Sequence, residues 1–418
     1  MRNKLFSMTV MVTTLTLVGC GGGGGGDSAG SGAASPQPES PGIITKNANA
    51  RKLINAPINI TSKNVIIAVA DSGVNVDHKE FSETFTDSRS GAYTTQTDYQ
   101  LGIDAEMNLE RQYSDDHYPD ALPRTPLSLS FNHGTIVGSL IYGSGVGLLS
   151  DGTILALDVA YNNLSYDGQN FNPVGAIIDN FAGMLAASNL AKIGHIDFIN
   201  ISSESATTYA KVDKLGPSQK DAFIALADSN IGLIASAGNS ALNFTEIFVS
   251  NTPDCTDSET SQAAADNDFY AIRRCAALAG LRDNVEFIPY KDPELAKSLI
   301  IVGAVDNEGV LQEFSNRPGN DSLIQKRFIV APGVNLEVAG VTTDGYAIVS
   351  GTSFAAPFVT AAAGALKSKF SGLSSQAALQ ALLDTANDKF DGYAPELHGV
   401  GILDIKKALE IDPRGYIT

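Results

Sequence analysis

Short apolar runs that alternate with helical patterns are the feature that most constrains the fold of this chain. Runs without polar interruption indicate strands buried on both faces, as in a parallel sheet covered by helices. We therefore predict an α/β fold, a doubly wound and mostly parallel sheet with helices on both faces. The predicted strands are Val65–Ala70, Ile154–Ala160, Ile196–Ser202, Ile231–Ala237, Leu299–Val305 and Phe328–Ala331. The predicted helices are Val174–Ile193, Ser218–Ser229, Ser353–Phe370 and Ser375–Asn387.

The N-terminal residues have the composition of an export signal. Arg2 and Lys4 precede an apolar run, Leu5–Val18, which is too short for a comfortable membrane span. We predict a signal peptide over 1–19. From 20 to 50 the chain is rich in Gly, Ser and Pro, which predicts a flexible tether. The folded domain is then predicted over 51–418, with insertions or long loops at about 84–130 and 243–295.

The end of the apolar run, Leu17-Val18-Gly19-Cys20, resembles the lipobox of bacterial lipoproteins. The resemblance implies that Cys20 is lipidated and that the protein is exported and anchored in a membrane by lipid. An ordinary signal peptide cut near Gly19 is the alternative. Gly21, in place of an Asp after the cysteine, resembles outer-membrane sorting if the organism has two membranes.

The net charge and the cysteines indicate which binding partners and cross-links to expect. The formal net charge of −18 disfavours nucleic-acid binding, and we expect a monomer whose acidity serves solubility. Cys255 and Cys275 are an even pair in an exported chain, which favours a disulfide over free thiols. With no nearby histidine they make a poor zinc site. We predict no metal ligands and no cofactor for the chemistry; structural calcium stays open because no calcium-loop motif is present.

Three segments carry residues suited to nucleophilic catalysis. Asp71 ends a buried apolar run, where α/β folds place their sites, although an Asp that caps a turn is equally common. His133 opens the apolar helical run Ile136–Ile141, and the helix dipole would favour its neutral form. A structural histidine is the alternative. Ser353 starts an Ala-rich helix among small residues, where it would otherwise be a helix cap.

The chain order Asp, His, Ser is one of the orders known for catalytic triads. The segments Asp-Ser-Gly, His-Gly-Thr and Gly-Thr-Ser-Phe-Ala-Ala-Pro around these residues resemble the signatures of the subtilisin-like serine proteases, over Val65–Leu403. The resemblance implies one catalytic domain and a serine endopeptidase that hydrolyses extracytoplasmic proteins through an acyl-enzyme. In it Ser353 is the nucleophile, His133 the general base and Asp71 the group that orients the histidine.

The same resemblance implies further site residues. Asn239, at the end of a predicted strand, would donate to the oxyanion together with the Ser353 N–H. Glu204 stands where the family commonly has glycine, and it would narrow the cleft, attract a basic side chain or point to solvent. Phe314-Ser315-Asn316 and Gly399–Asp404 also resemble family segments, and we interpret them as structural. The substrate-binding residues implied in this way are Ser202, Ser203, Glu204, Ala237 and Gly238.

Other readings of the sequence are weaker. The interval between Cys20 and Asp71 leaves no room for the inhibitory propeptide domain usual in the family, so we expect folding without one. An esterase would carry Gly-x-Ser-x-Gly around its nucleophile, which Ser353 lacks. An inactive binding protein on this fold would not need all three triad residues and Asn239. A Ser-Glu-Asp peptidase would not carry His133 in a His-Gly-Thr setting.

Overall fold

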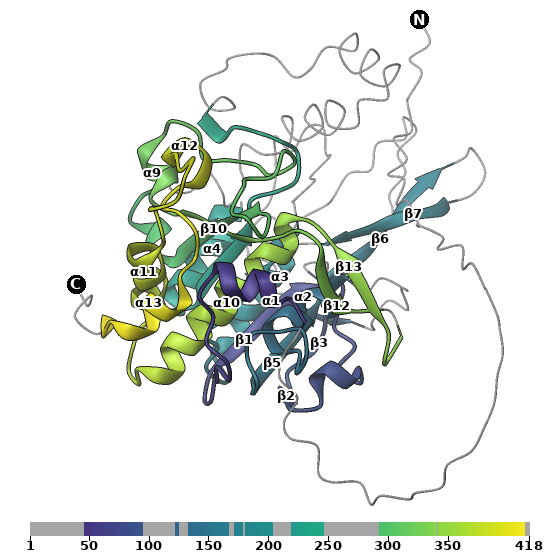
Figure 1. Cartoon of the computed structure of the whole chain (residues 1–418). Coiled ribbons are helices and arrows are strands. Elements are labelled where there is room, and N and C mark those ends of the chain that lie inside the picture. The colour runs from purple at the N-terminus through teal and green to yellow at the C-terminus, as the bar shows by residue number, and fades with distance from the viewer. Residues whose placement is uncertain are drawn as a thin grey trace, which may run out of the picture.

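A mainly parallel sheet forms the centre of the molecule (Figure 1). The computed structural model describes residues 46–94, 122–124, 133–166, 171–178, 180–203, 219–245, 292–340 and 342–413. The strands of this sheet are β1 (Ile66–Asp71), β2 (Thr84–Thr86), β3 (Gly91–Thr94), β4 (Leu122–Arg124), β5 (Gly152–Asp158), β8 (Phe198–Ile201), β9 (Gly232–Ser236), β10 (Leu299–Val305) and β11 (Phe328–Pro332).

The strand order places the end of β1 at the point where ligands bind in open α/β sheets. The order is β11-β10-β9-β8-β1-β5-β3-β4, and β2 pairs with β5 outside this path. Every pair is parallel except β3–β4. The chain runs from β1 to β5 on one side and later returns to β8 on the other. Beside such a reversal the carboxyl ends of the strands border a crevice, and Asp71 is the last residue of β1.

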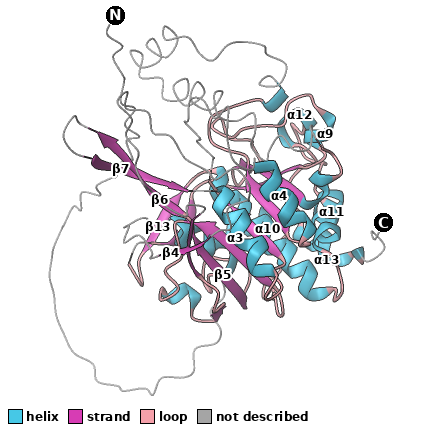
Figure 2. Ribbon diagram, turned by 180° about the vertical axis from the view of Figure 1, so that it is seen from behind, coloured by secondary structure: helices cyan, strands magenta, loops and turns pink. Residues whose placement is uncertain are grey.

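Helices cover both faces of the sheet, and small residues bring them close. A Cβ on Gly364 of α10 would lie 2.9 Å from Ile67, whereas a Cβ on Gly183 of α3 would lie 2.6 Å from Ala70. Ile67 and Ala70 point to opposite faces of β1, so α10 and α3 lie on opposite sides; Figure 2 shows α3 and α4 on the rear side. The helices are α1 (Ala48–Leu53), α2 (His133–Tyr142), α3 (Asn180–Ala191), α4 (Gln219–Asp228), α9 (Ser322–Gln325), α10 (Thr352–Lys369), α11 (Ser375–Thr385), α12 (Pro395–His398) and α13 (Ile405–Glu410), with 3₁₀ turns η1 (Lys79–Phe81) and η4 (Leu295–Ser298).

The predicted fold class is confirmed, and the central strands lie within a few residues of their predicted bounds. All seven residues of β10 are buried, as expected for a strand between two helical layers. No helix within the described ranges is both long and apolar enough to cross a bilayer.

The predicted helix Val174–Ile193 is wrong in its first part. A hairpin of β6 (Ala160–Tyr166) and β7 (Phe171–Ile178) stands there, and α3 begins only at Asn180. Pro173 and Gly175 disfavour a helix at this point, and antiparallel pairing with β6 satisfies the backbone instead. The hairpin projects from the body of the molecule (Figure 1).

Pairing between separate segments corrects one further expectation and adds one element that the sequence analysis did not predict. The stretch 84–130, predicted as an insertion, contributes β2, β3 and β4 to the central sheet. A second hairpin, β12 (Leu336–Ala339) with β13 (Tyr346–Val349), was missed by the sequence interpretation, and it leads directly into α10.

The predicted end of the tether at residue 50 is too late. Helix α1 begins at Ala48, and Ala50 and Ile54 are buried against the core. Arg51 is buried as well and donates to the carbonyl of Gly147 at 2.7 Å, while burial lowers its pKa. The folded part therefore includes residues that the composition assigned to the tether.

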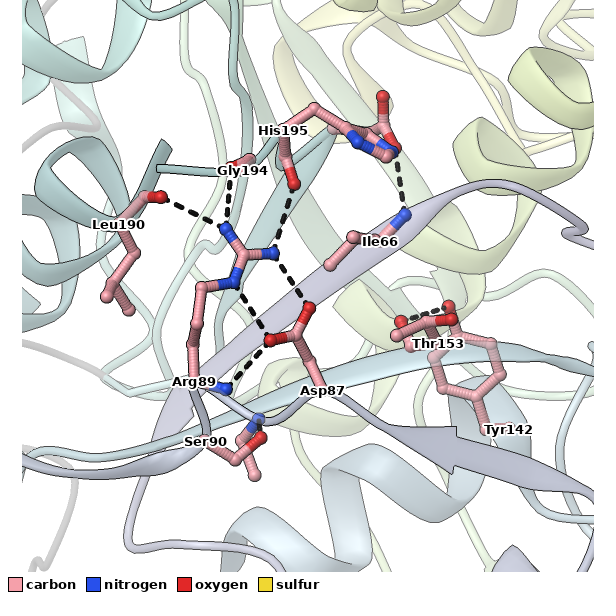
Figure 3. A network of polar contacts seen from close by, with 11 residues as sticks. Ile66, Asp87, Arg89, Ser90, Tyr142, Thr153, Leu190, Gly194 and His195 are labelled. Atoms are coloured by element: carbon pink, nitrogen blue, oxygen red, sulfur yellow. Dashed lines mark hydrogen bonds and ion pairs between the residues drawn. The ribbon is translucent and has the colours of Figure 1, made fainter. Parts of the chain in front are cut away.

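One arginine ties the end of α3 to the turn between β2 and β3 (Figure 3). The Arg89 guanidinium forms two hydrogen bonds with the carboxylate of Asp87, at 2.9 and 2.7 Å. Its other N–H groups donate to the carbonyls of Leu190 (3.0 Å), Gly194 and His195 (3.2 Å). These hydrogen bonds hold the pKa of Asp87 below its ordinary value and cap the carboxyl end of α3.

Arg89→Lys is expected to lower the free energy of unfolding by about 2–4 kcal/mol, because a lysine leaves several of these groups without partners. The Arg89 and Asp87 side chains are only 14% and 11% exposed, so water compensates little. Urea titration followed by circular dichroism measures the change. The control is Lys297→Ala, which removes an exposed ion pair with Glu294 and should change stability by less than about 0.5 kcal/mol. Equal stability of Arg89→Lys and wild type would refute the role of the network.

Candidate active site

The end of β1 and the start of α2 bring Asp71 and His133 together. His133 Nδ1 lies 3.0 Å from Asp71 Oδ1 and 2.9 Å from Oδ2. The Asp71 side chain is fully buried, whereas that of His133 is 22% exposed. The backbone N–H of Ser72 also donates to Asp71 Oδ1 at 2.7 Å. A buried carboxylate held in this way fixes the proton on Nδ1, so Nε2 is left as the basic nitrogen.

Two glycines explain how α2 comes so close to β1. A Cβ on Gly134 would lie 2.2 Å from the carbonyl oxygen of Gly73 and 3.0 Å from the Cβ of Asp71. Any larger residue would push the helix start away from the carboxylate. Gly73 itself has a φ of 84°, which favours glycine. The Asp-Ser-Gly and His-Gly-Thr segments therefore pack directly against each other.

The pKa of His133 is raised above its ordinary 6.5. Burial alone would lower the pKa, but the charge of Asp71 and its hydrogen bond raise it by more. The expectation that the helix start would favour the neutral imidazole therefore has the wrong net sign. The facing carboxylate outweighs the helix dipole because it is a full charge in contact with the ring.

This shift predicts the acid side of the pH profile. A general base must be neutral, so activity is lost as pH falls through the raised pKa of His133. The half-maximum of kcat/KM on the acid side is expected above pH 6.5. Steady-state kinetics on a peptide substrate between pH 5 and 9 measures it. An acid limb centred below pH 6.5 would contradict the dominance of Asp71.

Ser353 is the second residue of α10, and the ring of its neighbour Phe354 lies next to the His133 ring. The ring centroids of Phe354 and His133 are 5.5 Å apart, and Ser353 is 7% exposed. Its backbone N–H belongs to the first helical turn, whose donors have no acceptor within the helix. Among the described residues no hydrogen bond joins the Ser353 hydroxyl to His133, and such bonds often tighten only when substrate is bound.

Asn239 follows β9 and is held against the start of α10. Its Oδ1 accepts hydrogen bonds from the N–H of Thr352 at 2.9 Å and from the Thr352 hydroxyl at 3.0 Å. These bonds orient the amide so that Nδ2 is the donating end, 3.6 Å from the position that a Cβ on Gly351 would take. The amide of Asn239 and the first turn of α10 therefore share one corner of the sheet edge. Sequence reasoning missed Thr352, although Gly-Thr-Ser contained it.

The substrate-binding residues implied by sequence divide into two groups. Ser202, Ala237 and Gly238 follow the adjacent parallel strands β8 and β9, at the same edge as Asp71. The Ser202 hydroxyl accepts a hydrogen bond from the Asn200 amide at 2.8 Å.

Ser203 also follows β8, but its hydroxyl donates to the side chain of Asn180 at the start of α3, so it forms the second group. Glu204, Cys20, Cys255 and Cys275 lie outside the described residues.

Nothing in the described ranges fits a metal ion. No group of three or more His, Cys, Asp or Glu side chains in those ranges is arranged to hold one.

A family model and several known proteins match this chain. The sequence profile of the Subtilase family matches residues 62–401. Serotype-specific antigen 1 of Mannheimia haemolytica is 33% identical over 128 residues, which are 29% of this chain and 13% of that protein's length.

Several solved structures share the fold with a TM-score above one half, among them the following two. MycP1 from Mycobacterium smegmatis is 20% identical with a TM-score of 0.52, covering 89% of this chain and 87% of that chain. The S41 psychrophilic protease is 18% identical with a TM-score of 0.51, covering 85% of this chain and 97% of that chain. At these identities the likeness shows the fold alone.

Proposed function

Because this chain belongs to the Subtilase family and is a serine-type peptidase, we propose that it is an endopeptidase whose triad is Asp71, His133 and Ser353. The observation that carries the assignment is the contact of His133 Nδ1 with both oxygens of the buried Asp71 carboxylate. A solvent-facing structural histidine would not need a fully buried ion-pair partner. The contact also leaves Nε2 as the proton acceptor on the side of the ring away from Asp71.

The proposed reaction proceeds in two stages. The Ser353 hydroxyl attacks the carbonyl carbon of the substrate while His133 Nε2 takes its proton. The C–N bond then breaks, and His133 returns the proton to the leaving amine, which leaves an acyl group on Ser353. In the second stage His133 deprotonates a water that attacks the acyl carbon, the bond from that carbon to Ser353 Oγ breaks, and His133 returns the proton to Oγ. Asp71 stabilises the imidazolium formed in both stages.

Asn239 and the Ser353 N–H are the proposed donors to the oxyanion. The developing negative oxygen needs donors that are already oriented before reaction. The orientation of the Asn239 amide by Thr352 supports this role, since Nδ2 then lies near Gly351, two residues before Ser353. We propose that Ser202, Ala237 and Gly238 form part of the cleft wall, and that Glu204 selects for basic side chains.

Incubation with an unfolded protein tests the endopeptidase activity. New internal N-termini should appear by mass spectrometry, at a rate that is first order in enzyme and about 10⁶-fold lower when His133 is replaced by Ala. Release of single terminal amino acids without internal cuts would refute the endopeptidase assignment. Preference for Lys or Arg before the cut, lost in Glu204→Gln, would support the role of Glu204.

We propose that the protein is exported and anchored by lipid on Cys20, in a form that acts on extracytoplasmic proteins. The lipobox-like Leu17-Val18-Gly19-Cys20 supports this location. Metabolic labelling with a fatty-acid probe should label the full-length protein and not Cys20→Ala. We also propose a Cys255–Cys275 disulfide, and two freely alkylated thiols in the non-reduced protein would exclude it.

A further inference from the structure

Asn316 is a fully buried polar residue that the sequence interpretation treated only as structural. It lies between β10 and α9, about eighty positions from Asn239 along the chain. A buried amide normally has hydrogen-bond partners, and those of Asn316 all belong to one turn. That turn is Ala237–Leu242, which connects β9 to the residues that follow and contains Asn239.

The amide of Asn316 holds this turn from both sides of Asn239. Its Nδ2 donates to the carbonyl of Ala237 at 2.7 Å, two residues before Asn239. Its Oδ1 accepts from the N–H of Ser240 at 3.1 Å and of Leu242 at 2.8 Å, after Asn239. The pattern uses the donor end and the acceptor end of the amide in one orientation.

The backbone around Asn316 adds to this grip. Its own N–H donates to the carbonyl of Gly238 at 3.0 Å. The neighbouring Arg317 N–H donates to the carbonyl of Leu242 at 2.9 Å. Gly238 and Ser240, the two residues on either side of Asn239, are therefore both hydrogen-bonded to Asn316.

Asn316 is itself fixed to the sheet. The Ser315 hydroxyl donates to the carbonyl of Asn316 at 2.9 Å and accepts from the N–H of Ala304 in β10 at 3.1 Å. Hydrogen bonds through Ser315 and Asn316 thus connect the turn that contains Asn239 to β10. Thr352 of α10 holds the side-chain amide of Asn239. Two independent supports set the position of one side chain.

We propose that Asn316 is a positioning residue for the oxyanion donor, setting where the Asn239 amide stands relative to Ser353. This inference rests on the proposed oxyanion role of Asn239. Preorganised donors lose effect steeply with small displacements, because their field must meet the charge that develops in the transition state. A side chain that only supported the fold would change stability without changing transition-state binding.

The test compares Asn316→Ser with wild type, Asn239→Ala and the double variant, each corrected by active-site titration. Asn316→Ser is expected to lower kcat by about 10- to 100-fold with little change in KM. Affinity for a peptide aldehyde, whose adduct carries the oxyanion, should fall by the same factor, and affinity for the matching peptide alcohol should not change. Arg89→Lys is the destabilised control, since it loosens the contact between the end of α3 and the turn between β2 and β3, and it should leave both affinities unchanged.

The double variant and Asn239→Ala separate the two claims. If Asn239→Ala keeps its kcat, the oxyanion role itself is wrong. If Asn239→Ala loses activity, the double variant should lose no more, because Asn316 acts through Asn239.

Unchanged kcat and aldehyde affinity in Asn316→Ser, or losses that multiply in the double variant, would overturn the inference. Asn316→Asp keeps the acceptor for Ser240 and Leu242 but not the donor to Ala237, and it is expected to show the same pattern if the serine variant does not fold.

Discussion

Ser353→Ala is expected to lower kcat for peptide hydrolysis by about 10⁶-fold, the scale known for loss of the serine in a subtilisin triad. Alanine has no hydroxyl oxygen to attack the substrate carbonyl, so no acyl-enzyme forms at this position. KM and the melting temperature should stay close to wild type, because alanine suits the first turn of α10 and only one hydroxyl is removed. Single-turnover assays at high enzyme concentration measure the residual rate.

A small loss would contradict the assignment of Ser353. Ser350→Ala, three residues earlier in the chain, is the matched control, since its hydroxyl accepts from the N–H of Asn335 at 3.0 Å. That variant should retain wild-type kcat. A loss shared by both variants would point to a disturbed helix start rather than to a missing nucleophile.

Asp71→Asn is expected to lower kcat by about 10⁴-fold, because the neutral amide neither selects the productive tautomer of His133 nor stabilises the imidazolium. It also removes the charge that raises the pKa of His133. The acid limb of any residual activity should therefore move to lower pH than in wild type. A pH profile of kcat/KM for the two proteins measures both effects.

The direction of the pH change distinguishes this role from a structural one. Asp197→Asn is a useful comparison, since Asp197 is also buried but pairs with Lys367 at 2.9 Å at the other end of the strands. It should lower stability without moving the acid limb. An acid limb that is unchanged in Asp71→Asn would show that Asp71 does not set the pKa of His133.

The sequence was sufficient to predict the central strands, because an apolar run indicates burial on both faces. This prediction does not require knowing which strands lie on either side. It failed where pairing between segments decides the structure. Polar residues of β2 form part of the sheet because β5 supplies their backbone partners. In the β6–β7 hairpin, residues with an apparently helical pattern form a strand because antiparallel pairing supplies their backbone partners.

The site shows the same division. Asp71, His133 and Ser353 were predicted from local patterns and their order in the chain, since each stands at the end of a strand or the start of a helix, and Asn239 was predicted from the resemblance to a family. Their supports were not, because a hydrogen bond from Asn316 to Ala237 joins positions that no local pattern relates. The sign of the His133 pKa shift was missed for that reason too, as it depends on the distance to Asp71.

The most direct test of the account is the site of covalent reaction with a fluorophosphonate. Wild type should form one phosphonyl adduct, and peptide mapping by mass spectrometry should place it on Ser353. Ser353→Ala should form none, and labelling of wild type should slow as pH falls through the raised pKa of His133. An adduct on a different serine, or no adduct in a protein that still cleaves peptides, would contradict the proposed triad.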